Sequence, residues 1–382
     1  MLYPIELHAL GQAGILREFR LRRRKRFQPA PCGDRARPRP PSRYPVPFKQ
    51  GSPSMTSIQP HPVTIVGAGG IGCAIGHALV TGGIDVTMVD ADTSKVEAGK
   101  KVGISIDGVD ARAATFVSFE SWQPASDGIV ILCTKCYDNG VVLERLGPDV
   151  MIIPVQNGFD PQLQERCTYE GIASFVSECD QDRPNTRITR DGDLHIGHCG
   201  GQAPLPTEVD AIVKILEQHA TFSVKRVADI LPFKHTKLMY NAAISPLAAI
   251  TGMDNGQLLT HAPARRLFFR FLRENYAILK GSHTTLGTVG PFHPDTVNKI
   301  LRTPLLGTIM AGPFSRSLKG TYCSMSGDIE TGRTEVENFN GHLVRLAGPT
   351  PCPLNQASCQ LVTRMATERA TPAMTYLDEL IA

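Results

Sequence analysis

The first part of the chain alternates short, strongly hydrophobic runs with segments that can form helices. The runs are rich in β-branched residues and occupy 63–66, 85–89, 128–133 and 150–155. Between the first two runs lies an apolar, helix-compatible segment over 71–80. Continuous apolar runs that alternate with helices are typical of buried strands in a parallel sheet. We therefore expect an α/β domain over residues 61–228.

The second part of the chain lacks this strand pattern. Its hydrophobic positions predict helices at about 233–252, 261–280, 293–303, 323–345 and 355–380. We expect an all-helical domain over residues 229–382. The predicted fold class is thus an α/β N-terminal domain followed by an all-α C-terminal domain.

One polar stripe interrupts the apolar helix predicted at 233–252. Lys237, Asn241 and Ser245 are spaced by four residues, so they lie along one face of a helix whose other faces are apolar. A lysine can bury its stem while its charge reaches water, and a core amide can simply be hydrogen-bonded. The stripe therefore has either a structural or a functional explanation.

Charge is distributed unevenly along the 382 residues. The net charge is +4, but residues 1–60 carry twelve Lys and Arg against three Asp and Glu. The remaining chain holds 28 basic and 33 acidic residues, so the folded body is slightly acidic and we expect no nucleic-acid partner. No apolar run is long enough to span a membrane, and the ten cysteines suit a reducing compartment. We expect a cytoplasmic protein with no membrane association.

Residues 1–60 have the composition of a disordered extension. A basic run at 17–26 precedes a segment rich in proline and arginine at 29–60, which cannot bury a core. An arginine-rich, acid-poor leader is also typical of a transit peptide or a nucleic-acid-binding tail. A third interpretation is that the segment lies upstream of a start at Met55. We expect disorder or a non-native extension.

A glycine-rich turn follows the first predicted strand. Gly67, Gly69 and Gly72 form G-x-G-x-x-G between a strand and a helix, and Asp90 ends the next strand. This context is typical of a Rossmann dinucleotide site: the glycines allow a tight turn, close approach of a diphosphate and close helix packing. An acid at the Asp90 position accepts hydrogen bonds from a ribose 2′-hydroxyl and favours NAD, although the nearby Lys95 would suit NADP. The predicted cofactor-binding residues of the turn are Gly67, Ala68, Gly69, Gly70, Ile71 and Gly72.

Two further strand ends carry polar residues. Lys135 follows the run at 128–133 and Asn157 follows the run at 150–155. Ligands of open α/β sheets bind at the carboxyl ends of strands, although each residue is also acceptable in an ordinary surface loop. Cys133 and Cys136 form a C-x-x-C without a second pair of matching spacing, so we expect no metal site.

The order of these motifs resembles the ketopantoate reductase family, also called 2-dehydropantoate 2-reductases. The resemblance covers almost everything from residue 61 onward. It rests on GAGGIG at 67–72, the strand-end Lys135, QNG at 156–158, KLMYNAAISPLAAITGMDNG at 237–256 and SMSGDIETGRTEVENFNG at 324–341. It implies a fold like that of 6-phosphogluconate dehydrogenase and NAD(P)H-dependent reduction of ketopantoate to pantoate, a step of pantothenate and coenzyme A biosynthesis.

The resemblance also implies roles for individual residues. Lys237 matches the general acid that protonates the substrate carbonyl oxygen, and Glu335 completes the catalytic set. An ammonium is suited to this role because hydride addition builds negative charge on that oxygen. Lys135 matches a residue beside the nicotinamide, and Asn157 one beside both nicotinamide and substrate. The other substrate-binding residues implied are Asn241, Ser245, Asn255 and Ser324.

The chain departs from the family pattern in several places. Ser245 replaces a common asparagine, and the acidic segment at 177–184 is unusual near a cleft. One residue is missing between Ser324 and Glu335, which a loop or kink at Gly332 would absorb. Ser245 and the acidic segment keep one alternative open, a reductase or dehydrogenase for another 2-oxo or hydroxy acid. A nucleotide-binding regulator that has lost catalysis is a further alternative, against which the joint presence of the catalytic and substrate-binding residues named above argues. The carboxylate at Asp90 is likewise atypical of NADP-preferring relatives.

Overall fold

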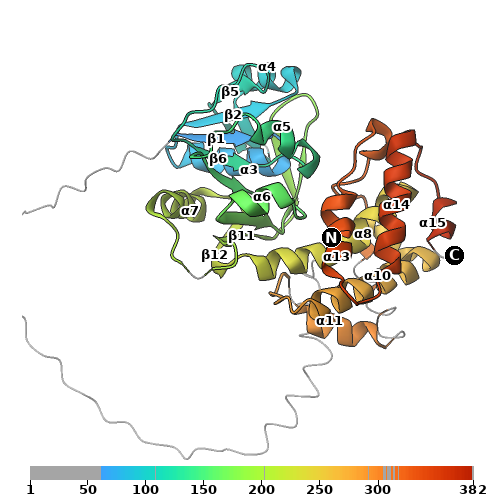
Figure 1. Cartoon of the computed structure of the whole chain (residues 1–382). Coiled ribbons are helices and arrows are strands. Elements are labelled where there is room, and N and C mark those ends of the chain that lie inside the picture. The colour runs from blue at the N-terminus through green and yellow to red at the C-terminus, as the bar shows by residue number, and fades with distance from the viewer. Residues whose placement is uncertain are drawn as a thin grey trace, which may run out of the picture.

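The computed structural model of the protein describes residues 62–107, 109–201, 203–290, 292–303, 307, 311–312, 315–316 and 318–380. The predicted extension at 1–60 lies outside the described residues. Figure 1 shows an α/β part formed by the first half of the described chain and a helical part formed by the second. The predicted fold class is confirmed, whereas the division at residues 228 and 229 stays a prediction.

A five-stranded parallel sheet forms the centre of the α/β part. Its strands lie in the order β5-β2-β1-β6-β7, and every neighbouring pair is parallel. The sheet is built from β1 (Val63–Val66), β2 (Val86–Asp90), β5 (Thr115–Ser118), β6 (Ile129–Leu132) and β7 (Met151–Pro154). The chain leaves β1 toward β2 on one side and returns to β6 on the other, so the carboxyl end of β1 is a topological switch point, where ligands of such sheets bind.

Alternation along each strand divides the sheet between two hydrophobic clusters. In β6, Ile129 and Ile131 belong to one cluster, whereas Val130 and Leu132 belong to the other. Successive side chains of a strand point to opposite faces, so a strand that is apolar throughout is buried on both. The covering helices include α3 (Gly70–Thr81), α4 (Thr93–Val102), α5 (Asn139–Leu143), α6 (Pro161–Arg166) and α7 (Thr207–His219).

Two smaller sheets complete the α/β part, and the hydrophobic pattern did not predict them. One has the order β4-β3-β10-β9 and the other β12-β11-β8. Their strands are β3 (Ile104–Ile106), β4 (Val109–Arg112), β8 (Tyr169–Ala173), β9 (Val176–Cys179), β10 (Asn185–Arg190), β11 (Asp193–His198) and β12 (Ser223–Asp229). The acidic segment at 177–184 is therefore a loop only from residue 180, because its first part belongs to β9.

The described residues after β12 form helices and connecting segments. The central helix of this helical part, α8 (Leu231–Thr251), is buried along most of its length and contains Pro246. The other elements are α9 (Asn255–Thr260), α10 (Ala262–Gly281), α11 (Pro294–Leu301), η3 (Ile329–Thr331), η4 (Glu337–Gly341), α13 (His342–Leu346), α14 (Pro353–Glu368) and α15 (Tyr376–Glu379). Among the helices that the structure describes, none combines the length and the apolar character needed to cross a membrane.

Two predicted helices are interrupted by left-handed residues. The segment predicted as one helix at 323–345 contains the short η3, which ends at Gly332 with φ of 80°. The segment predicted at 355–380 ends its long helix α14 at Arg369, with φ of 50°. A left-handed residue turns the chain out of a right-handed helix. The break at Gly332 lies where a loop or kink would absorb the shortened spacing inferred between Ser324 and Glu335.

Candidate active site

The glycine-rich turn is packed tightly on one side and open on the other. Gly67 has φ of 102°, and a Cβ there would lie 2.9 Å from the backbone of Cys133 and Thr134. A Cβ on Gly72 would lie 2.0 Å from the carbonyl oxygen of Gly67, which holds helix α3 against the turn. A Cβ on Gly69 would meet nothing within 4 Å. The turn is therefore fixed by its outer glycines and exposes Gly69 at the start of α3, a geometry that fits a bound diphosphate.

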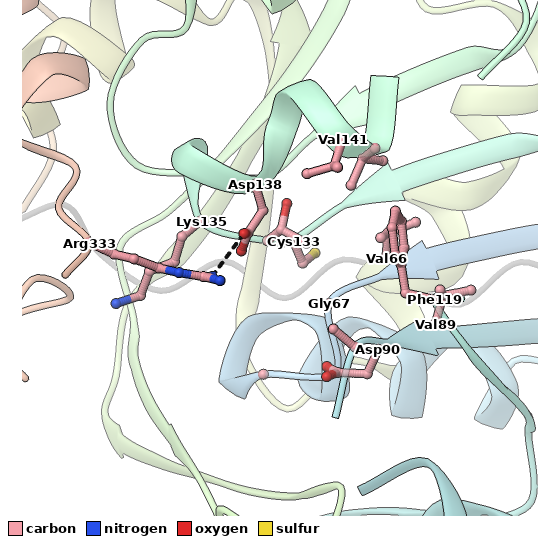
Figure 2. Close-up of a pocket in the computed structure, with 14 residues that line it drawn as sticks. Val66, Gly67, Val89, Asp90, Phe119, Cys133, Lys135, Asp138, Val141 and Arg333 are labelled. Atoms are coloured by element: carbon pink, nitrogen blue, oxygen red, sulfur yellow. Dashed lines mark hydrogen bonds and ion pairs between the residues drawn. The ribbon is translucent and has the colours of Figure 1, made fainter. Parts of the chain in front are cut away.

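A pocket of about 460 Å³ lies against this turn, within the size range of small-molecule sites. Figure 2 shows it between the glycine turn and the loop that follows β6. The polar or charged side chains and glycines that define it include Gly67, Gly69, Asp90, Lys135, Asp138 and Arg333. The first five come from the α/β part, whereas Arg333 comes from the helical part.

Asp90 supports the turn directly, a role that sequence analysis did not identify. Its two carboxylate oxygens accept hydrogen bonds from the backbone N–H groups of Ala68, at 2.7 Å, and Asp92, at 2.9 Å. An ionised carboxylate has about four acceptor positions. Asp90 therefore braces the turn and keeps acceptor capacity for a ribose hydroxyl.

Lys135 connects the loop after β6 to the helical part. Its Nζ lies 2.5 and 2.6 Å from the two carboxylate oxygens of Asp328 and also donates to the carbonyl oxygen of Ser324. Burial raises the pKa of Asp328, although Lys135 opposes that shift. Asp328 lies within the quoted motif at 324–341, yet its spacing alone gave no signal that it pairs with Lys135.

Glu335 lies beside the same loop and is 2% exposed. Its Oε1 accepts a hydrogen bond of 3.2 Å from the backbone N–H of Cys136. Burial raises the pKa of Glu335 to about 7, although the positive charge of Lys135 and the Cys136 hydrogen bond act in the opposite direction. A carboxyl group with this pKa exchanges a proton near neutral pH.

Asn157 lies next to a buried amide network. The Gln156 side chain donates to the Thr134 carbonyl at 2.7 Å and to Asn139 Oδ1 at 2.8 Å. The backbone carbonyl of Asn157 accepts from Cys136 Sγ at 3.0 Å. Gln156 thereby ties together the loops after β6 and β7, which hold Lys135 and Asn157, respectively.

Lys237 is fully enclosed, with 1% of its surface exposed. Its Nζ donates to the carbonyl oxygen of Ala173, at the end of β8, at a distance of 3.0 Å. Burial and the positive charge of Arg190 lower the pKa of Lys237 well below its usual value. Lys237 and Glu335 thus contact different loops of the α/β part, at Ala173 and Cys136, respectively.

Two amide atoms near the polar stripe are buried without a hydrogen-bond partner. Asn241 is 2% exposed and its Nδ2 is unpartnered within the described part of the chain. Asn255 donates from Nδ2 to Thr321 Oγ1 at 3.2 Å, but its Oδ1 is likewise unpartnered there. An unpaired buried polar atom costs about 1–3 kcal/mol, so such atoms mark places where a ligand or water completes the structure.

The structure brings the predicted site residues into three groups. The glycine turn and Asp90 form one, and Lys135, Ser324 and Glu335 meet around the loop after β6. The stripe on α8 forms the third: Ser245 is 1% exposed, and its backbone carbonyl accepts from Cys323 Sγ at 3.6 Å, next to Ser324. Among the described residues, no cluster suited to holding a metal ion is found.

The fold and the pocket define a two-part protein in which an α/β half of the dinucleotide-binding type is joined to a helical half. Residues 63–200 match the family model described as ketopantoate reductase PanE/ApbA, and residues 229–366 match the model of that family's C terminal part. The chain belongs to the ketopantoate reductase PanE/ApbA family, whose members are oxidoreductases.

Known proteins of low sequence identity to this chain support the family assignment. The 2-dehydropantoate 2-reductase of Pyrobaculum aerophilum is 25% identical over 249 residues, which cover 64% of this chain and 80% of that protein. The solved PanE/ApbA family ketopantoate reductase of Ralstonia eutropha JMP134 is 20% identical, with a TM-score of 0.62 and coverage of 81% of this chain and 99% of that one.

Two further solved structures share the fold. D-mandelate dehydrogenase, solved with NADH and anilino(oxo)acetate, is 17% identical, with a TM-score of 0.61 and coverage of 84% of this chain and 100% of that chain. A dimeric ketopantoate reductase from Staphylococcus aureus is 18% identical, with a TM-score of 0.59 and coverage of 81% and 100%, respectively. Proteins with this fold therefore include D-mandelate dehydrogenase, which has a differently named activity and was solved with NADH.

Proposed function

We propose that this protein is a 2-dehydropantoate 2-reductase, which reduces ketopantoate to pantoate with NADH or NADPH. One observation carries the proposal: a fully buried lysine amine, Lys237, lies on a helix face with the amide nitrogen of Asn241, which has no hydrogen-bond partner among the described residues. An enclosed ammonium and an unsatisfied amide donor suit a small oxyanion, and the family assignment supports a 2-oxo acid as the ligand.

The reduction requires a hydride for the carbonyl carbon, which the bound dinucleotide supplies, and a proton for the carbonyl oxygen. Lys237 donates that proton. Its lowered pKa favours release of the proton, and its position in a water-poor interior strengthens the attraction for developing negative charge. Asn241 Nδ2 donates a hydrogen bond to a substrate oxygen, and Asn255 Oδ1 accepts one from the substrate hydroxyl. Ser324 holds the substrate carboxylate, and Ser245 extends the wall of the substrate site.

The dinucleotide is held by the pocket at the end of β1. The turn formed by Gly67, Ala68, Gly69, Gly70, Ile71 and Gly72 receives the diphosphate, and Asp90 receives the adenine ribose. Since a carboxylate repels a 2′-phosphate, we expect NADH to be preferred over NADPH. Lys135 and Asn157 would contact the nicotinamide end of the dinucleotide, and Glu335, with a pKa of about 7, would bind or release a proton beside Lys135.

Steady-state kinetics of the purified full-length protein test this proposal. Oxidation of NADH and of NADPH is followed by absorbance as ketopantoate is varied. We expect saturable, ketopantoate-dependent oxidation, with the larger kcat/KM for NADH. An absence of ketopantoate-dependent oxidation with both cofactors would contradict the proposal.

A second candidate is a reductase or dehydrogenase for another 2-oxo or hydroxy acid. Ser245 favours it, since a short side chain in place of a longer amide enlarges the predicted substrate site. The neighbour solved with NADH and anilino(oxo)acetate shows that the fold accommodates a bulkier acid. A panel of aliphatic and aryl 2-oxo acids decides between the candidates: a much larger kcat/KM for an acid other than ketopantoate would select the second. Replacement Ser245→Asn should then shift the preference toward ketopantoate.

Three further features complete the proposal. We propose a homodimer formed through the helical part, in line with the dimeric neighbour from Staphylococcus aureus. We place the boundary between the two domains at residues 228 and 229. The predicted cytoplasmic location also stays a proposal, which fractionation of the native source would test.

A further inference from the structure

Arg333 is the contribution of the helical part to the dinucleotide pocket. It follows Gly332, whose left-handed conformation turns the chain toward the loop after β6. Its guanidinium lies 3.1 Å from the carboxylate of Asp138 and 5.3 Å from the centre of the Tyr137 ring. Figure 2 shows this side chain extending toward Asp138, with a dashed line marking the ion pair.

The charges that line the pocket are balanced before any ligand binds. Among the described residues of its lining, Asp90 and Asp138 are acidic, and Lys135 and Arg333 are basic. Lys135 is held by Asp328 and by the Ser324 carbonyl. Arg333 is therefore the lining cation whose partner, Asp138, itself belongs to the pocket.

A dinucleotide changes this balance because its diphosphate carries negative charge. The Asp138 carboxylate would repel a diphosphate at the glycine turn, since the loop that carries it packs directly on Gly67. Arginine is suited to phosphate because its planar guanidinium can donate two parallel hydrogen bonds. The Arg333 side chain is 57% exposed, so it can reorient without disturbing the core.

We propose that Arg333 is a dinucleotide-binding residue that exchanges Asp138 for the cofactor diphosphate. The proposal rests on the proposed function to the extent that the pocket binds a nicotinamide dinucleotide, and it does not depend on the substrate. In this proposal the α/β part and the helical part both contribute residues to the dinucleotide site. In the unliganded protein the Asp138 carboxylate binds the guanidinium, and the diphosphate displaces it when the dinucleotide binds.

Binding measurements on the full-length protein test this role without any turnover. Trp122 is the single tryptophan of the chain, and it is buried in a cluster with Val66, Val89 and Val142, which line the pocket. Energy transfer from this tryptophan to a reduced nicotinamide therefore reports the Kd of NADH and NADPH. Calorimetry supplies the Kd of ADP and of adenosine.

The two partners of the ion pair should give opposite results. We expect Arg333→Gln to raise the Kd of NADH, NADPH and ADP by about 10-fold, since a charge-assisted hydrogen bond is lost. The Kd of adenosine should not change. We expect Asp138→Asn to tighten binding of the same three ligands. The matched control is Arg364→Gln, because Arg364 forms a comparable ion pair with Glu379 at 2.7 Å, with side chains 47% and 46% exposed. This control should bind all ligands as the wild type does.

Three outcomes would overturn the assignment. If Arg333→Gln raised the Kd of ADP and of adenosine equally, the pocket as a whole would be disturbed. If Arg333→Gln and Asp138→Asn both raised the Kd of the dinucleotides, the ion pair would be purely structural. A loss confined to NADPH would place the guanidinium at the 2′-phosphate instead of the diphosphate. The proposed function fails separately: normal dinucleotide binding without reduction of any 2-oxo acid would reject the activity and leave the role of Arg333 intact.

Discussion

At the scale of single residues, burial shifts the pKa values of two ionisable groups of the candidate site in opposite directions. Burial raises the pKa of Glu335 to about 7, and burial with the charge of Arg190 lowers the pKa of Lys237. Groups whose pKa values are shifted by their surroundings are common at catalytic sites. The polar stripe drew attention to Lys237, and the family resemblance gave it a catalytic role, but its enclosure depends on the contact of α8 with β8.

Replacement of Lys237 by methionine separates catalysis from folding. Lys237→Met keeps the length of the side chain and removes the amine, so we expect kcat to fall by about 10²–10⁴-fold. The Kd of NADH should not change, and thermal stability should be kept or raised, since a buried charge is removed. Kinetics, dinucleotide titration and thermal unfolding check the three parts. Unchanged kcat would remove Lys237 from the mechanism.

Glu335 should make stability depend on pH. Its folded-state pKa is about 7 against a usual value of 4.5, so the folded state binds the extra proton between these values. Stability is therefore lost as pH rises from about 4.5 to about 7, by about 3 kcal/mol. Glu335→Gln should lack this loss, so the difference in unfolding free energy between wild type and variant should change across the window. Urea unfolding at pH 5 and pH 8 measures it, and a constant difference would contradict the shift.

At the scale of elements, the turn between β1 and α3 combines rigid and open positions. Gly67 and Gly72 contact neighbouring backbone so closely that a methyl group cannot be added without displacement. Gly69 has ordinary backbone angles, φ of −82° and ψ of −169°, and open space beside it. The fold itself therefore does not require glycine at position 69.

Gly69→Ala tests whether that open space belongs to the diphosphate. The alanine fits the backbone and clashes with no described atom, so the melting temperature should stay within about 2 °C of wild type. The Kd of NADH should rise by at least about 10-fold, because the methyl group occupies the approach to the turn. Gly147→Ala is the control: Gly147 also has free space around its Cβ position and does not line the pocket. Equal binding by both variants would contradict a diphosphate at Gly69.

At the scale of the whole molecule, the two halves are joined by contacts of two kinds. Near α8 they are buried: Lys234 pairs with Glu170 of β8, and their side chains are 5% and 2% exposed. Phe159 follows β7 yet belongs to the hydrophobic core of the helical part. Near Gly332 buried and exposed contacts lie together: Glu335 is buried against Cys136, whereas Arg333 and Asp138 are 57% and 37% exposed. The two halves are thus joined by buried contacts and by an ion pair that solvent can reach.

Breaking the buried pair should destabilise the chain more than removing both of its charges. Lys234→Met leaves the Glu170 carboxylate buried without its partner and should lower the unfolding free energy by about 3–5 kcal/mol. Addition of Glu170→Leu should recover most of that loss. Lys214→Met is the control, since Lys214 pairs with Asp210 at the surface and should contribute less than about 1 kcal/mol. Urea unfolding compares them, and equal losses for the single and double variants would argue against a charge effect.

The sequence predicted features that depend on neighbours along the chain and missed those that depend on distant ones. The strand runs, the glycine turn and the stripe on α8 follow from local periodicity and spacing. The pairs Lys135–Asp328 and Arg333–Asp138 join residues separated by nearly 200 positions, and no local pattern encodes such contacts. The small sheets escaped prediction because their strands are short and only partly apolar. The hydrophobic pattern predicted one helix over 323–345, and only the comparison with the family spacing suggested a loop or kink at Gly332.

The unequal exposure of the contacts between the halves determines how each one responds to dissolved salt. Counter-ions screen a solvent-accessible pair such as Arg333–Asp138 far more than the buried Lys234–Glu170 pair. Moderate salt should therefore release the guanidinium of Arg333 and leave the surroundings of Lys237, which lies within one turn of Lys234, unchanged.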